Sequence, residues 1–476
     1  MTTVAKNYDV AIIGAGTAGL AALHEVRKRT DNFVIINAGP YGTTCARVGC
    51  MPSKALIEAA NAFERRKVLD AFGVRGAASL SVDTTAVMRR VRELRDYFVR
   101  ELRATTDKLG ERSVAGTARF VEPDVLAVNG ALCRARTIVI ATGSKPVLPP
   151  EWAALPDRIL TSDTLFDLES LPARMAVIGM GVVGAEIAQA LARLGVHVTG
   201  YSAGQRVAGL ADPVVNEQAA KLLAAEFDLV TCERAQLHSE GSGVRVTAGD
   251  KSMVVDKVLA ALGRRPNLDG LGLEHIGVTL DAHGLPPFAR NTMQIADLPI
   301  YIAGDVSEGL PVLHEASDEG YIAGQNAVRP APICFSRRVP LAIVFTDPNV
   351  ASVGARFDSL DAAKIHIGMV DFSRQGRARM AQENRGVLRV YAARETGRLL
   401  GAEMCAPRAE NIAHLLALAI QQELTVQELL RLPFYHPVFE EGLRTALRDV
   451  VRQLGPLATR QPGDLANCDP VQKPTS

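Results

Sequence analysis

The sequence of 476 residues predicts an α/β protein with two parallel-sheet domains of one design, followed by a C-terminal α+β domain. Two observations support this fold class. A glycine-rich turn between an apolar strand and a helix occurs twice, in YDVAIIGAGTAGLAAL and in RMAVIGMGVVGAEIAQAL. Towards the C-terminus, the apolar strands RGVLRVYAA and RLLGAEMCA are followed by helical patterns.

Composition and charge are those of an ordinary globular protein. Hydrophobic residues make up 47% of the chain and charged residues 22%, and the net charge is +1. A charge so close to zero predicts no nucleic-acid partner and no attraction to an anionic membrane. The start of the chain lacks the pattern of a signal peptide, and no apolar run reaches the length of a membrane span. We therefore expect a cytoplasmic protein.

The two glycine-rich segments follow one pattern, G-x-G-x-x-G, at the same place between strand and helix. Each is followed by a second apolar strand, FVIINAG or VHVTGYSAG, which ends 23 residues after the first glycine. This repetition predicts two Rossmann-like dinucleotide-binding units, because glycines let the backbone approach a pyrophosphate at a helix N-terminus. The predicted phosphate-binding glycines are Gly14, Gly16 and Gly19 in the first unit and Gly179, Gly181 and Gly184 in the second.

Two further features of the repeat bear on nucleotide binding. ATGSKP, with Thr142 and Gly143, is matched by ALGRRP, with Gly263. The second strands end in Asn37 and Ser202, where an acid usually binds the ribose hydroxyls. Without an acid at the second site a 2′-phosphate is not repelled, and Arg206 is a candidate to attract one. The choice between NAD(H) and NADP(H) therefore stays open.

Cys45 and Cys50 lie five positions apart just after the first unit. Pro52 indicates the opening turn of a helix that we expect to continue to Phe72. A disulfide between the two cysteines requires an irregular turn, which Gly49 permits. On spacing alone, two buried free thiols are an equal alternative. The nearby Lys54 and the helix N-terminus favour a reactive pair, and the absence of a second Cys/His pair at ligand spacing argues against a metal.

Thiol exchange also needs a group that takes and returns a proton. The stretch LPFYHPVFEEGLRTAL offers His436 with Glu441. Pro437 is expected at the first position of a helix, which would place Glu441 one turn into it. Attraction between glutamates and the helix dipole is the alternative explanation for Glu441. If the first nucleotide is FAD, it could mediate between a nicotinamide and a disulfide.

Taken in order along the chain, these motifs resemble those of the flavoprotein disulfide oxidoreductases, a family in which the lipoamide dehydrogenases are most similar to this sequence. The resemblance runs from about Asp9 to Ala446. It rests on GAGTAG, CARVGC, ATG, GMGVVG, ALGRRP, YIAGD, FTDPNVASVG and HPVFEE. The family implies FAD and NAD(H) or NADP(H) as cofactors, and a homodimer.

The resemblance also implies roles for individual residues. Cys45 would attack the substrate, and Cys50 would be the charge-transfer thiol beside the flavin. His436, oriented by Glu441, would be the acid/base catalyst and would serve the active site of the other subunit. The remaining implied site residues are Lys54 and Glu186 as an ion pair at the flavin edge, Asp305 at the ribityl chain, and Thr44, Ala118 and Leu313 as further FAD contacts.

The family further implies a division of the chain. The expected parts are an FAD-binding domain at 1–150, an NAD(P)-binding domain at 151–268, a central segment at 269–338 that completes the FAD site, a dimerisation domain at 339–456, and a tail at 457–476. The expected substrate is a small disulfide or dithiol, with a lipoyl group on a carrier domain as one alternative.

The sequence leaves three functions open. The first is electron transfer between dihydrolipoamide and NAD+ through Cys45 and Cys50. The second is NADPH-dependent reduction of another disulfide or of a metal ion, and the third is a flavin-binding module without turnover. Glutathione reductases carry a tyrosine where this chain has Val182, and NADPH-specific relatives often carry an arginine where it has Ala203. At both positions the chain looks more like a lipoamide enzyme. A mercuric reductase would end in a vicinal cysteine pair, whereas this chain has only Cys468 there. Thr43, Asn37, Ser202 and Val438 depart from the lipoamide pattern and favour a different disulfide.

Overall fold

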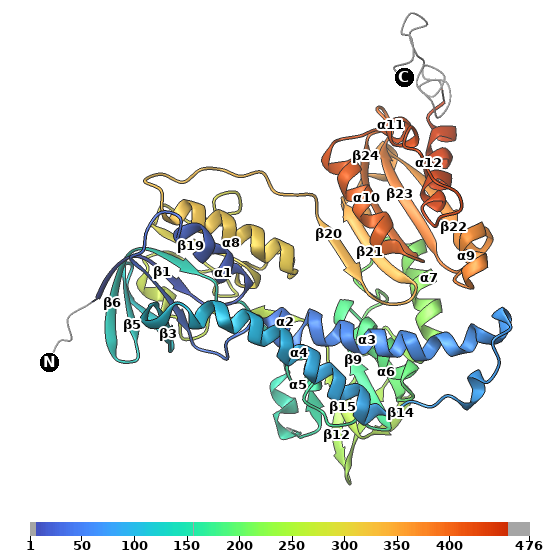
Figure 1. The fold of residues 1–476 in the computed structure, drawn as a ribbon, viewed down its shortest axis with the longest axis horizontal. Coiled ribbons are helices and arrows are strands. Elements are labelled where there is room, and N and C mark those ends of the chain that lie inside the picture. The colour runs from blue at the N-terminus through green and yellow to red at the C-terminus, as the bar shows by residue number, and fades with distance from the viewer. Residues whose placement is uncertain (1–5, 156, 456–476) are drawn as a thin grey trace, which may run out of the picture.

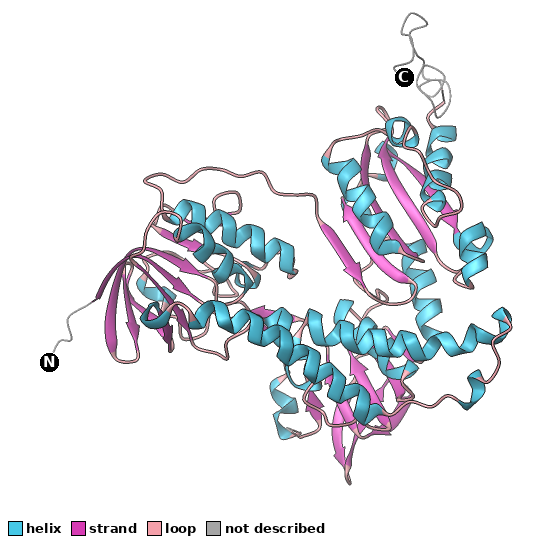
Figure 2. Cartoon of the chain, in the orientation of Figure 1, coloured by secondary structure: helices cyan, strands magenta, loops and turns pink. Residues whose placement is uncertain are grey.

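The computed structural model describes residues 6–155 and 157–455, which form three parts, each built from a sheet and the helices packed on it (Figure 1). Each of the three large sheets is covered by helices, as Figure 2 shows. The expected tail at 457–476, with Cys468, lies outside the described residues.

The first glycine-rich unit belongs to a nine-stranded sheet with the central order β19-β6-β1-β2-β3, in which neighbouring strands are parallel. Helix α1 (Thr17–Val26) follows the glycine turn and packs against α8 (Leu313–Ala327). The strands are β1 (Lys6–Ile13), β2 (Phe33–Asn37), β3 (Ser113–Ala115), β4 (Ala118–Glu122), β5 (Val125–Val128), β6 (Ala131–Ile140), β17 (Phe288–Ala289), β18 (Gln294–Ile295) and β19 (Ile300–Ile302).

The second unit forms a parallel sheet of five strands in the order β11-β10-β9-β15-β8. Its strands are β8 (Ile159–Leu160), β9 (Arg174–Ile178), β10 (His197–Ser202), β11 (Asp228–Thr231) and β15 (Lys257–Ala260), and its helices are α5 (Ser162–Leu165), α6 (Val182–Arg193) and α7 (Pro213–Ala224). Three antiparallel strands, β12 (Gln236–Glu240), β13 (Gly243–Ala248) and β14 (Lys251–Val255), cover one side. The two units are joined by a short antiparallel pair, β7 (Ser144–Pro146) with β16 (Arg264–Pro266).

The C-terminal part is an antiparallel sheet in the order β20-β21-β24-β23-β22 with helices packed against it. Its strands are β20 (Leu341–Val344), β21 (Asn349–Gly354), β22 (Ile365–Asp371), β23 (Val387–Ala393) and β24 (Leu399–Ala406). Its helices are α9 (Gly376–Ala381), α10 (Ala409–Gln421), α11 (Val426–Leu430) and α12 (Glu441–Gln453). Two parallel-sheet units followed by an α+β part confirm the predicted fold class.

Helices α2 (Thr44–Val48), α3 (Cys50–Glu64) and α4 (Thr84–Asp107) extend from the first unit across the second (Figure 1). The sequence predicted one helix through Phe72, but α3 ends at Glu64 and Arg65–Phe72 is a 3-10 helix. None of the eight residues in this 3-10 segment is buried, so no packing face holds it in α-helical form.

Candidate functional site

The two glycine turns have the same backbone geometry. Gly14 has φ +112°, and a Cβ there would lie 2.2 Å from the carbonyl oxygen of Ala141. Gly179 has φ +100°, and a Cβ there would lie 2.2 Å from the carbonyl oxygen of Ala261. In both units the first glycine thus lets the turn pass against the strand that ends in ATG or ALG.

In each turn the third glycine makes a close backbone contact, and the second glycine faces open space. A Cβ on Gly19 or Gly184 would lie 1.9 or 1.8 Å from the carbonyl oxygen of the first glycine, so helix and turn touch there. A Cβ on Gly16 or Gly181 would meet no atom within 4 Å. This open space in front of a helix N-terminus is a cradle that suits the pyrophosphate of a dinucleotide.

A cavity of about 520 Å³ opens from the first turn and reaches the two cysteines. Two polar atoms in and beside it, Thr142 Oγ1 and His314 Nε2, are buried without a hydrogen-bond partner among the described residues. Unpaired buried polar atoms of this kind are expected where a polar ligand is to be bound. The predicted residues Gly16, Thr44, Cys45, Cys50, Lys54, Gly143, Glu186, Asp305 and Leu313 line the cavity. The site thus fits FAD.

Five predicted cofactor-binding residues of the first unit do not line this cavity: Gly14, Gly19, Thr142, Ala118 and Asn37. Ala118 is buried at the start of β4. Asn37, at the end of β2, accepts a hydrogen bond from the backbone N–H of Ala15 at 3.2 Å and donates one to the carbonyl of Gly39 at 2.7 Å. Its side chain therefore ties the glycine turn to the loop after β2.

The cysteine pair lies on two helices with a break between them. Cys45 is in α2 and Cys50 begins α3, and Gly49 between them has φ −118° and ψ −115°. This break is the irregular turn that the spacing required. Both cysteines are free thiols, and the two thiols are hydrogen-bonded to each other.

The hydrogen bond from Cys45 lowers the pKa of Cys50 to about 7, against the opposing effect of burial and with help from the charge of Lys54. The same hydrogen bond, together with burial and the negative charge on Cys50, raises the pKa of Cys45. Near neutral pH the pair therefore shares one proton, which lies on Cys45, and Cys50 has thiolate character.

The predicted ion pair between Lys54 and Glu186 is present at the edge of the cavity. The ammonium of Lys54, on α3, donates to the two carboxylate oxygens of Glu186 at 3.0 and 2.8 Å. Glu186, on α6, also accepts from the backbone N–H of Phe345, just after β20, at 2.8 Å. One carboxylate thus connects the cysteine-bearing helix, the second nucleotide unit and the C-terminal part.

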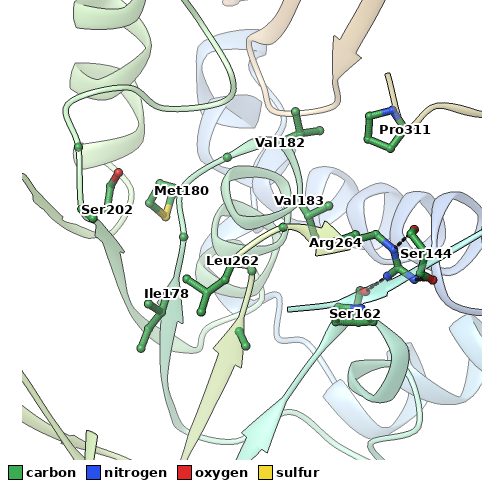
Figure 3. Close-up of a pocket in the computed structure, with 18 of the residues that line it drawn as sticks. Ser144, Ser162, Ile178, Met180, Val182, Val183, Ser202, Leu262, Arg264 and Pro311 are labelled. Atoms are coloured by element: carbon green, nitrogen blue, oxygen red, sulfur yellow. Dashed lines mark hydrogen bonds between the residues drawn. The ribbon is translucent and has the colours of Figure 1, made fainter. Parts of the chain in front are cut away.

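A larger cavity of about 1150 Å³ follows the second glycine turn, and the predicted residues Gly179, Gly181, Ser202 and Gly263 line it. It shares a wall with the first cavity, to which Val182, Val183, Ser162, Arg264, Asp305 and Ile343 contribute. In Figure 3, Arg264 reaches Ser144 and Ser162 at this wall, while Ser202 lies at the other end of the cavity. A nucleotide in each cavity would meet the other at this wall.

Arg264 links the two cavities through hydrogen bonds. Its guanidinium donates to Ser144 Oγ at 2.9 Å, to Ser162 Oγ at 3.1 Å and to Asp163 at 3.0 Å. Ser144 Oγ in turn donates to Asp305 at 2.7 Å. The predicted FAD residue Asp305 is therefore held by an arginine of the second unit, which the sequence analysis did not single out.

The far end of the larger cavity holds no acid on β10. Ser202 is followed there by Ala203 and Gly204. Arg206, the candidate for a 2′-phosphate, donates instead to Asp358 at 2.8 Å. The basic residue that lines the cavity away from the shared wall is Arg234, after β11, and the acid Glu233 lines it beside Arg234. The sequence analysis missed Arg234 because strand order, not sequence distance, places it beside β10.

His436 and Glu441 contact each other as expected, at 3.0 and 3.1 Å from Nδ1 to the carboxylate oxygens. Burial favours a higher pKa for Glu441, but hydrogen bonds from His436 and from the backbone of Val438 outweigh it and lower this pKa. The His436 side chain is 79% exposed and does not line either cavity within one chain. The structure therefore does not bring it to the cysteines of its own subunit.

The predicted helix start at Pro437 is wrong, because α12 begins at Glu441. Side chains hold the preceding turn instead. The Gln375 amide donates to the carbonyl of Val438 at 2.7 Å, and Glu441 accepts from the backbone N–H of Val438 at 3.3 Å. These bonds fix the residues after His436 in a turn and leave Glu441 at the first position of the helix.

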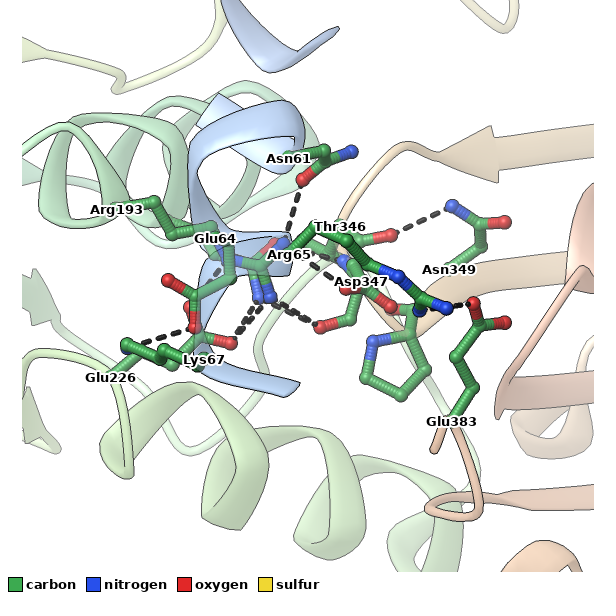
Figure 4. Close-up of polar contacts among 12 residues, drawn as sticks. Asn61, Glu64, Arg65, Lys67, Arg193, Glu226, Thr346, Asp347, Asn349 and Glu383 are labelled. Carbon is green, nitrogen blue, oxygen red and sulfur yellow. Dashed lines mark hydrogen bonds and ion pairs between the residues drawn. The ribbon is translucent and has the colours of Figure 1, made fainter. Parts of the chain in front are cut away.

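A second polar junction joins the same three elements further along α3 and α6 (Figure 4). The Arg193 side chain is 1% exposed, and it donates to Glu226 at 2.6 and 2.7 Å, to Asn61 at 2.6 Å and to Asp347 at 3.0 and 3.1 Å. Asn61 lies seven residues after Lys54, and Arg193 seven after Glu186. The two junctions therefore lie on one face of each helix, two turns apart.

Among the described residues, no group of three or more His, Cys, Asp or Glu side chains is placed to hold a metal ion. None of the helices described is long and apolar enough to cross a bilayer.

Comparisons with known proteins agree with this arrangement. Residues 8–320 match the pyridine nucleotide-disulphide oxidoreductase family, and residues 340–447 match its dimerisation domain. A dihydrolipoyl dehydrogenase of Bacillus subtilis is 29% identical over 460 residues, covering 93% of this chain and 98% of its own length. A mercuric reductase of Lysinibacillus sphaericus is 30% identical over 453 residues, covering 92% of this chain and 82% of its own.

Solved structures show the same fold. LpdA from Mycobacterium tuberculosis superimposes with a TM-score of 0.81 at 27% identity, over 93% of this chain and 99% of its own. The HOCl-induced flavoprotein disulfide reductase RclA from Escherichia coli has a TM-score of 0.81 at 22% identity, with coverage of 93% and 99%, and so supports the fold alone. Proteins of this kind bind FAD and NAD(P)H. The chain belongs to the pyridine nucleotide-disulphide oxidoreductase family.

Proposed function

We propose that this protein is a dihydrolipoyl dehydrogenase, which passes electrons between dihydrolipoamide and NAD+ through Cys45 and Cys50. The observation that carries the proposal is the hydrogen-bonded thiol pair at a cavity that fits FAD and shares a wall with a second nucleotide cavity. FAD would supply the chemistry that moves an electron pair between this dithiol and a nicotinamide.

The thiol pKa values support distinct roles for the two cysteines. In the oxidised state, a substrate thiolate would attack Cys45, forming a substrate–Cys45 bond and releasing Cys50. Cys50 is a good leaving group because its pKa is lowered to about 7. The second substrate thiol would then attack its own mixed disulfide, which closes the substrate disulfide and returns Cys45 as a thiol. His436 would take up the proton that this second thiol loses and pass it to the leaving sulfur of Cys45.

We further propose that the working unit is a homodimer. His436 is exposed and lies away from the cavity of its own chain, so it can act only on a site supplied by another copy. The match to a dimerisation domain over residues 340–447 supports this arrangement. A variant held as a monomer should bind both nucleotides but should not turn over a dithiol.

An NADPH-dependent reductase of another disulfide or of a metal ion is the second candidate. β10 ends in Ser202 rather than in an acid, and Arg234, which lines the cavity beside Glu233, offers a positive charge to a 2′-phosphate. The similarity to a mercuric reductase points in the same direction. If this candidate is right, Arg234→Gln should weaken NADPH binding by about tenfold, the effect of losing one charge-assisted hydrogen bond, and leave NADH binding unchanged. Arg206→Gln is the control, because Asp358 already holds Arg206.

The two candidates are separated by a substrate panel of lipoamide, glutathione disulfide and Hg(II), each with NADH and with NADPH. We expect the highest kcat/KM with lipoamide and NAD(H), and loss of turnover in Cys45→Ser. As a control, Cys232→Ser replaces an exposed cysteine just after β11 and should keep full activity. Full lipoamide turnover by Cys45→Ser would contradict the proposal, and preference for NADPH with another acceptor would favour the second candidate.

A further inference from the structure

The loop between β10 and α7 forms the end of the larger cavity that lies away from the shared wall. It begins after Ser202 with Ala203, both of which line this cavity, and it ends at Asp212, where α7 starts. Within the loop, the backbone N–H of Ala208 donates to the carbonyl of Met180 in the second glycine turn at 2.8 Å. A movement of this loop would therefore alter both the Ser202 end of the cavity and the backbone of the glycine turn.

The end of this loop is bonded to the C-terminal sheet. Glu403, on β24, is fully buried, and one of its carboxylate oxygens accepts from the backbone N–H groups of Ala211 and Asp212 at 2.7 and 2.9 Å. Its other oxygen accepts from the backbone N–H of Phe357, after β21, at 3.1 Å. A single buried carboxylate thus joins the loop of the second unit to the C-terminal part.

The side chain of Asp212 fixes the same point from the opposite direction. Its buried carboxylate caps α7 by accepting from the backbone N–H of Val214 at 2.9 Å. It also accepts from the Arg389 guanidinium at 2.6 and 2.7 Å and from the Tyr391 hydroxyl at 2.8 Å. Both donors lie on β23, where Arg389 is paired with Glu403, and α7 packs against β23 and β24 (Figure 1).

Two exposed contacts add to this attachment. The Arg356 guanidinium donates to the carbonyl of Gly209 at 3.0 Å, and Arg206 pairs with Asp358 at 2.8 Å. Exposed ion pairs contribute little, whereas buried hydrogen bonds to a charged group are stronger. We therefore expect the buried bonds to dominate in holding the loop.

We propose that Glu403 is a positioning residue for the nicotinamide nucleotide, because its bonds to this loop hold the second cavity in the shape that binds the nucleotide. A loop that is held in advance needs no ordering when a ligand arrives. If the loop is released, the apparent affinity falls with the fraction of molecules in the binding shape. The inference goes beyond the proposed function, since it does not depend on which disulfide is the substrate.

The bonds in question are made to the backbone of the loop and do not read the phosphate of the nucleotide. We therefore expect the same loss of affinity for NAD+ and for NADP+. This distinguishes Glu403 from Arg234, whose substitution should affect only the nucleotide with a 2′-phosphate.

Calorimetric titration of the oxidised holoenzyme with NAD+ and with NADP+ tests the inference. We expect Glu403→Leu to raise both dissociation constants about tenfold, and Glu403→Gln to raise them less than about threefold. The amide oxygen of the glutamine can still accept from Ala211 and Asp212, so this variant is the conservative rescue. The FAD content should not change. When NADH reduces the flavin, its half-saturating concentration should rise about tenfold in Glu403→Leu, and the rate at saturation should stay within about twofold.

Arg193→Met is the matched control. It breaks another buried junction between the second unit and the C-terminal part, but Arg193 is not among the described residues that line either cavity. Its nucleotide affinity should stay within about twofold. If Glu403→Leu does not fold, the double variant Arg356→Gln, Tyr391→Phe loosens the same loop more mildly and should raise both constants about fivefold.

Three results would overturn the inference. Unchanged dissociation constants, in Glu403→Leu or in the double variant that replaces it, would show that the loop needs no support. An equal loss in Arg193→Met would show that affinity follows overall stability, and loss of FAD from Glu403→Leu would show that the effect is not confined to the second cavity. Failure to turn over lipoamide would contradict the proposed function alone, because the titration involves no disulfide substrate.

Discussion

The two glycine-rich units have the same turn but use their helices differently. Helix α1 meets α8 through small residues, so that a Cβ on Gly320 would lie 2.2 Å from the carbonyl oxygen of Ala18. Helix α6 instead carries the buried polar residues Glu186, Gln189 and Arg193, and these bind groups on α3 and near β20. One helix is thus held by close backbone contact and the other by buried polar bonds.

The strands that follow these helices differ in the same way. Asn37 at the end of β2 uses its amide within its own unit, on Ala15 and Gly39. Ser202 at the end of β10 makes only a contact of 3.5 Å to the carbonyl of Arg206 and leaves its end of the cavity open. The side chain at the end of β2 is therefore bonded within the first unit, whereas the side chain at the end of β10 faces the cavity of the second unit.

The shared glycine motif therefore determines the backbone of the turn, but it does not determine which contacts the following helix makes with the rest of the chain. The turn is constrained by contacts at the first and third glycines, which are the same in both units. The outer face of α6 is constrained by three parts of the chain that meet there. The position of Lys54 beside the cavity therefore depends on the second unit as much as on the first.

The largest effect is expected from Arg193→Met, which removes polar contacts of α6. It leaves the nearly buried Glu226 carboxylate without its cation, whereas Asp347 keeps Arg385 at 3.3 Å, so we expect a loss of about 3–5 kcal/mol in the free energy of unfolding. Arg174→Met removes an exposed pair with Asp256 from the same unit, and should cost less than about 1 kcal/mol. Urea denaturation of both variants measures the difference. Equal small losses would mean that α6 is not held by its polar face.

The second test uses the glycines that the units share. Gly19→Ala and Gly184→Ala place a Cβ within 2 Å of a backbone oxygen, and overpacking of this kind costs about 1–3 kcal/mol in either unit. Gly16→Ala and Gly181→Ala meet no protein atom within 4 Å, and should change stability by less than about 0.5 kcal/mol.

The binding measurements for the same four variants sharpen the comparison. Gly16→Ala should be purified with less flavin, and Gly181→Ala should bind nicotinamide nucleotide more weakly while keeping its flavin. Visible absorbance and calorimetric titration measure the two effects. If Gly181→Ala lost flavin instead, the assignment of the two cavities would have to be exchanged.

The sequence predicted the parts of the site that depend on local geometry. Glycine spacing predicted both turns, and a disulfide between Cys45 and Cys50 would require the break that occurs at Gly49. Residues that act across domains were harder to predict. Arg193 and Arg264 are ordinary arginines in the sequence, and only tertiary packing brings Arg193 to Asn61 and Asp347. The start of α12 was missed because a side chain from α9, Gln375, sets the turn before it.

The smallest expected effect concerns the charge that each unit presents to Cys50. Lys54 lowers the pKa of this thiol and Glu186 raises it. Lys54→Met should therefore raise the pKa above about 7 by less than about one unit, or 1.4 kcal/mol, and Glu186→Gln should lower it.

The rate of iodoacetamide alkylation against pH measures this shift in the reduced protein. Because the folded-state pKa of Cys50 lies below the ordinary value of 9.0, the thiolate stabilises the fold fully above pH 9.0, and this stabilisation is lost as the pH falls through about 7. The rate of Cys50 alkylation should increase as the pH rises through about 7, because the thiolate is the reactive form. Cys405, whose pKa burial raises to about 12, is the internal control and should stay unreactive. Shifts of the same sign in Lys54→Met and Glu186→Gln would mean that the two charges act only as a pair, and that the second unit has no separate influence on the thiol.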